Sequence, residues 1–180
     1  MLVACGQSSQ PEDVTPVTQT VESTPAALTV ETVNQANSTL EKLTGARLGE
    51  IQVQSIAISP TGNLSVDALD PAKPTEFNQY VAYPDGRTDI RPYDYGGAEN
   101  YDALVATLFG ADLVSPEILV NSWEDSFNRV QGDRTEMSAS GATVARESMS
   151  GEIELYIVNG PERDRQTVYY DPAGNFLRVS

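Results

Sequence analysis

Histidine is absent from this sequence of 180 residues, and cysteine occurs once, at Cys5. Without histidine, the chain cannot build Ser-His-Asp or Cys-His catalytic groups, histidine-ligated zinc, or the usual general base near neutral pH. A single cysteine allows neither an intrachain disulfide nor a cage of thiolates around a metal. We therefore expect no bound metal and no cofactor.

Positive charge is also scarce, because 11 lysines and arginines stand against 26 acidic residues, which gives a net charge of −15. Such a surface repels phosphate backbones and anionic headgroups, so we expect no nucleic-acid partner. The simplest interpretation is solubility in a salty, extracytoplasmic setting; the alternative is an acidic surface for a cationic partner or Ca²⁺. The sequence also has no run of about 20 apolar residues that could span a membrane.

The stretch Leu2-Val3-Ala4-Cys5 has the order of an aliphatic residue, a tolerant position, a small residue and then cysteine. It resembles the lipobox of bacterial lipoproteins, in which the cysteine carries the lipid, so Cys5 is the predicted lipid-attachment residue. A secretory signal should precede such a box, yet only Met1 does, which suggests a shortened chain or a start codon assigned too late. The alternative is a chance match in a cytosolic protein.

The residues behind this box, up to about Ala26, are rich in Ser, Thr, Gln and Pro and contain no Lys or Arg. A segment of this composition cannot bury enough apolar surface to offset the entropy of ordering it. We therefore predict that residues 1–26 form the lipobox remnant and a disordered tether. A single globular domain should follow, over residues 27–180.

Hydrophobic periodicity predicts a helix and then strands in the first half of this domain. Thr29 is the expected N-cap and Gly45 the end of the helix. Alternating patterns in "IQVQSIAIS" and "LSVDALD" predict strands joined by a turn at "PTGN". The stretch "FNQYVAYPDGRTDIRPY" predicts a hairpin about Asp85-Gly86, a dipeptide suited to a tight turn with positive φ.

The second half repeats this order. A helical block covers residues 99–131, and its first apolar stripe consists of Tyr101, Leu104, Val105 and Leu108. The block contains a new helix start at Ser115-Pro116. In that helix, Leu119, Trp123, Phe127 and Val130 form the expected buried stripe, so Trp123 is a predicted core residue. Strand patterns follow in "ATVARESMS", "EIELYIVNG", "RQTVYYDP" and "NFLRVS".

The two halves therefore predict an α+β fold made of two tandem helix-meander repeats, over about 27–95 and 96–180. We expect one antiparallel sheet of about eight strands with the helices packed on one face. The pattern resembles bacterial cell-envelope lipoproteins, many of them actinobacterial, and is similar in outline to beta-lactamase-inhibitor-like and PepSY-like domains. The matching stretches are "QYVAYPDG", the helix around Trp123 and "YYDPAGNFLRV". This resemblance implies a secreted or anchored binding domain and supplies no catalytic residue.

Carboxylate pairs are the remaining route to catalysis. Glu152 and Glu154 stand two residues apart and should lie on the same face of a strand, and a glycosidase needs two carboxyls about 5–9.5 Å apart. The simpler interpretation is a solvated strand face, because no aromatic groove accompanies them. A carboxylate-dependent hydrolase acting on a cell-wall polymer therefore stays as the alternative function.

The run "DIRPYDYGGAENYD" places Tyr93 and Tyr95 in a loop between the halves that is too rich in Gly and Pro for a core strand. Exposed tyrosines often anchor partners, so these two residues are the candidate ligand-binding residues. Their spacing with the nearby acids does not match a known calcium-binding loop. The structural alternative, which we favour, is a linker whose tyrosines fold back on the sheet.

Together these patterns favour a non-enzymatic, lipid-anchored cell-envelope protein on the extracytoplasmic face of the membrane. Its domain should bind a protein or a small molecule of the envelope. Contact with the membrane should occur only through lipid on Cys5, and the folded domain should be a monomer.

Overall fold

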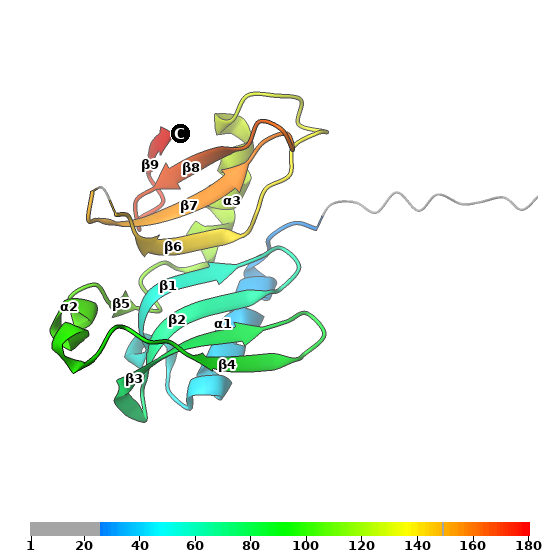
Figure 1. The fold of residues 1–180 in the computed structure, drawn as a ribbon. Coiled ribbons are helices and arrows are strands. Elements are labelled where there is room, and N and C mark those ends of the chain that lie inside the picture. Colours follow the sequence, from blue (N-terminus) through cyan, green and yellow to red (C-terminus); the bar gives the residue numbers. More distant parts are fainter. Residues whose placement is uncertain (1–25, 149) are drawn as a thin grey trace, which may run out of the picture.

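The computed structural model describes residues 26–148 and 150–180 and confirms the predicted α+β class. The first half contains one long helix and a four-stranded meander (Figure 1). Its elements are α1 (Val30–Thr44), the short 3-10 turn η1 (Leu48–Glu50), β1 (Gln52–Ile58), β2 (Leu64–Asp70), β3 (Lys73–Ala82) and β4 (Thr88–Pro92).

The second half has the same order of elements after a short connecting segment. The connection contains η2 (Ala98–Asn100), α2 (Tyr101–Val105) and β5 (Phe109–Gly110). The second meander then follows its own helix, with α3 (Pro116–Arg129), β6 (Ala142–Arg146), β7 (Ile153–Asn159), β8 (Gln166–Tyr170) and β9 (Phe176–Val179).

All strands belong to one open antiparallel sheet with the order β4-β3-β2-β1-β6-β7-β8-β9, and β5 pairs with β1 outside this order. The two meanders join through their first strands, where Ile56 lies opposite Val144 and Ala57 lies opposite Thr143. The sheet therefore runs without a break from one half to the other, and its edges are the last strands of the two meanders.

The predicted helix starts are confirmed by their hydrogen bonds. The Thr29 side chain accepts from the Thr32 N–H at 3.1 Å, and the Ser115 hydroxyl accepts from the Ile118 N–H at 3.3 Å. Each cap satisfies one of the N–H groups that a helix start leaves without an intrahelical acceptor. Gly45 ends α1 with a φ of 70°, in the left-handed region that favours glycine.

Three hairpin turns share one sequence pattern, in which proline stands second and glycine fourth of five residues. In the β3–β4 turn, Tyr83 donates to the Arg87 carbonyl and Gly86 donates to the Tyr83 carbonyl. The φ of Gly86 is 84°, which confirms the positive φ predicted from the Asp-Gly dipeptide. The same pair of bonds closes the turns over residues 59–63 and 171–175.

Helices α1 and α3 lie on the same face of the sheet, which is the arrangement that the sequence predicts (Figure 1). The core between them and the sheet takes residues from both halves. Trp123 is 5 % exposed, and its indole N–H donates to the Ser140 carbonyl at 2.7 Å, so its predicted core position is confirmed. Phe127, one turn further along α3, is only half-buried.

The connecting helix α2 is shorter than α1 and α3 and packs on the opposite face of the sheet. Leu69 and Phe77 face each other on β2 and β3, on the side opposite α1, and Leu104 of α2 packs on them. The expected stripe over residues 101–108 is wrong at Val105, which is 42 % exposed. This short helix covers only a small second cluster of buried residues, which consists of Leu69, Phe77 and Leu104.

Candidate binding surface

The face of the sheet opposite α1 and α3 carries a broad set of side chains, most of them half-buried, which we call the open face. Because side chains alternate along a strand, the positions between the core residues of each strand must point to this side. Most of these side chains are hydroxyl, amide, tyrosine or arginine groups. The open face consists of Ser55, Ala57, Ser65, Asp67, Gln79, Val81, Asp89, Arg91, Thr143, Ala145, Glu154, Tyr156, Val158, Thr167, Tyr169 and Arg178.

In the first half, a row of hydrogen bonds crosses four strands of the open face. The Arg91 guanidinium donates to the Gln79 carbonyl oxygen at 3.5 Å, and the Gln79 amide donates to Asp67 at 3.3 Å. The Ser55 hydroxyl then donates to the other carboxylate oxygen of Asp67 at 2.9 Å. Arg91 also pairs with Asp89 at 2.7 Å. Each side chain therefore holds its neighbour in place.

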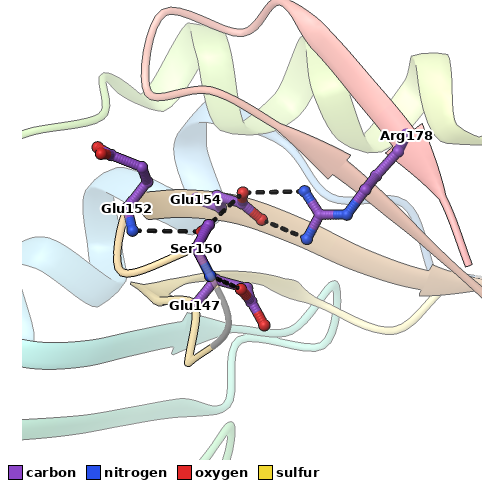
Figure 2. A network of polar contacts seen from close by, with 5 residues as sticks. All are labelled: Glu147, Ser150, Glu152, Glu154 and Arg178. Atoms are coloured by element: carbon purple, nitrogen blue, oxygen red, sulfur yellow. Dashed lines mark hydrogen bonds and ion pairs between the residues drawn. The ribbon is translucent and has the colours of Figure 1, made fainter.

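In the second half, arginine and tyrosine side chains stack on one another. The Arg178 guanidinium carbon lies 3.9 Å from the centre of the Tyr169 ring. The rings of Tyr169 and Tyr156 lie 6.0 Å apart. Arg178 also donates to both oxygens of Glu154, each at 2.9 Å, as Figure 2 shows. The hydrogen bond to Glu154 is the main cause that raises the pKa of Arg178 above its ordinary value.

A depression of about 420 Å³ lies in the middle of this surface, beside the junction of β1 and β6. The small side chains of Ser55 and Ala145 line it, together with Asp67. Two further walls are Thr107, which follows α2, and Glu147, Ser148 and Gly151 from between β6 and β7. Arg146 joins these two walls, because its guanidinium donates to the carbonyls of Thr107 and Gly151.

The expectation of a solvated carboxylate pair at Glu152 and Glu154 is wrong. Glu154 is 3 % exposed and is held by Arg178 and by the Ser150 hydroxyl at 3.4 Å. Glu152 precedes β7, and its side chain points away from Glu154 (Figure 2). A strand spacing of two places residues on one face only where both belong to the strand, and here β7 begins at Ile153.

The two candidate tyrosines have different surroundings. The Tyr95 hydroxyl donates to the Thr75 carbonyl at 2.9 Å, and its ring packs near that of Tyr101. Tyr93 is 52 % exposed and meets Phe77 edge-on, with ring centres 5.6 Å apart. Tyr95 thus follows the favoured interpretation of a loop folded back on the sheet, and Tyr93 keeps an accessible ring.

Cys5 lies outside the described residues. Within the described part of the chain, no helix is long and apolar enough to cross a membrane. The same residues contain no group of three or more acidic or cysteine side chains placed to hold a metal ion.

Comparison of the chain with protein-family models, curated proteins and solved structures finds no match.

Sequence reasoning did not single out Tyr156, Tyr169 and Arg178, although all three stand in recognised strand patterns. The alternation in "ELYIVN" and "TVYY" shows that two faces exist. It does not show which face the helices cover, because both faces carry large side chains. That choice comes from the packing of α3 on Leu155, Ile157 and Val168.

Proposed function

We propose that this protein is a non-enzymatic, lipid-anchored protein of the cell envelope, whose domain binds a partner protein through the open face. The observation that supports this function is a preordered surface of hydroxyl, amide, tyrosine and arginine side chains across eight strands. Tyrosine and arginine are enriched among the residues that dominate binding energy at protein interfaces. Side chains that already hold one another lose little entropy on binding.

The charge of this surface favours a protein over a nucleic acid. The cations of the open face stand beside acids, since Arg91 pairs with Asp89 and Arg178 with Glu154. The open face is thus close to neutral within a strongly acidic chain. A broad surface of mixed polarity with a central depression suits a partner that presents one protruding side chain.

The alternative, a hydrolase that uses two carboxylates, is less well supported. Both oxygens of Glu154 accept from Arg178, whereas a catalytic carboxyl must face its substrate. Glu152 belongs to the turn before β7, so the two acids do not form a site together.

Site-specific photo-crosslinking tests the open face. A photoreactive residue at Tyr169 should capture a defined partner in cells of the source organism, and the same residue at Gln35, on the exposed side of α1, should not. Tyr156→Ala with Tyr169→Ala should weaken binding of the captured partner about 30-fold or more, as expected for interface hot spots. Gln35→Ala, on the exposed side of α1, serves as the control and should leave this binding unchanged. Equal capture from both faces would exclude the proposed surface.

Detergent partitioning tests the anchor. Expressed behind a secretory signal in a bacterium, the protein should enter the detergent phase, and Cys5→Ser should remain in the aqueous phase. The physical reason is that acyl chains supply about 0.8 kcal/mol per buried methylene, whereas the acidic chain repels anionic headgroups. Equal partitioning of wild type and Cys5→Ser would rule out lipid attachment at Cys5.

A further inference from the structure

A second hollow lies away from the open face, at the end of α3. It measures about 490 Å³, within the range of about 300–1,000 Å³ typical of small-molecule sites. Four segments distant in sequence surround it, and most of the contributing side chains are apolar. The hollow is lined by Ala26, Ala27, Pro60, Thr61, Trp123, Glu124, Phe127, Arg134, Met137, Ser138 and Ala139.

The interior of this hollow offers carbon atoms to a ligand. The Trp123 indole N–H already donates to the Ser140 carbonyl at 2.7 Å, so its ring presents an apolar edge. The Ser138 N–H likewise donates to the Gly160 carbonyl at 3.2 Å. Met137 is 8 % exposed and adds a flexible apolar side chain. A ligand body without hydrogen-bonding groups therefore fits this interior.

Charge stands only at the rim. Arg134 lies over the Phe127 ring, with the guanidinium carbon 5.1 Å from the ring centre. It pairs with Glu124 at 3.6 Å, and both side chains are at least half exposed. An ion pair this exposed contributes little free energy, so an anionic ligand group can take the place of Glu124.

From this arrangement we infer that the hollow binds a small amphipathic anion, namely a single acyl chain that ends in a carboxylate. The chain lies against Trp123, Phe127 and Met137, and the carboxylate pairs with Arg134. This site is separate from the open face and does not depend on the proposed protein partner.

Trp123 is the only tryptophan of the chain, so ligand binding can be followed by its fluorescence. The full chain is titrated with hexanoate, octanoate, decanoate and dodecanoate, each below its micelle concentration. The Trp123 emission should change with ligand concentration and reach a plateau. The affinity should rise about four-fold for each methylene buried. Equilibrium dialysis measures the same binding independently of the fluorescence signal.

Two substitutions test separately how the acyl chain and the carboxylate of the ligand contribute to binding. Ala27→Leu fills the hollow from an exposed position and should weaken decanoate and decanol alike. Arg134→Gln should weaken decanoate about two- to five-fold, the value of an exposed ion pair, and leave decanol unchanged. Arg163→Gln, an exposed arginine outside the hollow, is the matched control and should alter neither.

Three results would overturn the inference: no saturable binding by dialysis, affinity independent of chain length, or an equal effect of the Arg134 and Arg163 variants. Tyr156→Ala with Tyr169→Ala should leave decanoate binding unchanged. That result distinguishes failure of this site from failure of the open face. Far-UV circular dichroism checks that each variant keeps its fold.

Discussion

At the scale of single residues, the ion pair of Glu154 and Arg178 allows a test of how a buried carboxylate depends on its partner. Glu154 has a side chain that is 4 % exposed, whereas that of Arg178 is 41 % exposed. Arg178→Met leaves the buried Glu154 carboxylate without its partner, which should lower the unfolding free energy. Urea denaturation measures this loss.

The double variant shows whether the loss comes from the stranded charge. Glu154→Leu with Arg178→Met removes both charges and should recover most of the stability, because a well-packed apolar pair often replaces a buried ion pair without loss. If the double variant is as unstable as Arg178→Met alone, the stacking of Arg178 on Tyr169 is the larger contribution.

Two buried tyrosines predict a loss of stability at high pH. Burial and the neighbouring Asp125 carboxylate raise the pKa of Tyr170 above its ordinary value of about 10, and burial is the main cause that raises the pKa of Tyr80. Above pH 10 the unfolded chain releases these phenolic protons while the folded chain retains them. The stabilisation is therefore complete below about pH 10 and is lost as the pH rises further.

Urea denaturation of wild type and Tyr170→Phe between pH 6 and 11.5, a range that extends through the ordinary tyrosine pKa of about 10, measures this effect. The unfolding free energy of Tyr170→Phe should fall less steeply with pH, because one of the two shifted groups is gone. Between about pH 6 and 8 the two curves should run parallel. A wild-type curve that stays flat above pH 10 would contradict the assignment.

At the scale of elements, the hairpin turns test how much a glycine with positive φ contributes to stability. Gly86 has a φ of 84° and Gly174 a φ of 86°, and each occupies the fourth position of its turn. A Cβ at Gly86 meets nothing within 4 Å, whereas one at Gly174 lies 3.1 Å from Cγ2 of Ile118. Gly86→Ala should therefore cost about 1–2 kcal/mol, the penalty for a left-handed L-residue.

Gly174→Ala should cost more than Gly86→Ala, because it adds a clash with α3 to the same backbone penalty. Thermal unfolding followed by circular dichroism compares the two variants directly. Equal losses would show that Ile118 moves aside without cost.

The same elements show what local sequence can predict. The caps at Thr29 and Ser115 and the turn at Gly86 depend on residues within a few positions of one another, and each of these predictions is confirmed. The predictions for Val105 and Glu152 are wrong. The environment of Val105 depends on where a distant strand lies, and that of Glu152 depends on where β7 begins. Local patterns do not contain that information.

At the scale of the whole molecule, the continuous sheet predicts a single unfolding transition. The core that packs under α1 and α3 takes residues from both halves, and Ile56 pairs with Val144 across the junction. Unfolding one half would therefore expose apolar surface of the other. Guanidinium denaturation followed by Trp123 fluorescence and by far-UV circular dichroism should give coincident curves.

A substitution at the junction tests the coupling. Val144 is 2 % exposed, and Val144→Ala should lower the unfolding free energy by about 2 kcal/mol. Both signals should shift together, because the junction belongs to both halves. A circular-dichroism transition that splits into two steps, one invisible to Trp123, would show that the halves unfold separately.

The sequence by itself determined the absence of histidine chemistry, the acidic charge, the α+β class and the order of helix and meander in each half. These properties depend on composition and on periodicities of two or 3.6 residues, which are local. Only the tertiary structure decided which face of each strand α1 and α3 cover, that α2 packs on one end of the opposite face, and that Tyr156, Tyr169 and Arg178 lie together. It also placed Ala27, Trp123 and Arg134 around one hollow. These contacts join residues far apart in the chain, and they form because the sheet buries one face against the long helices.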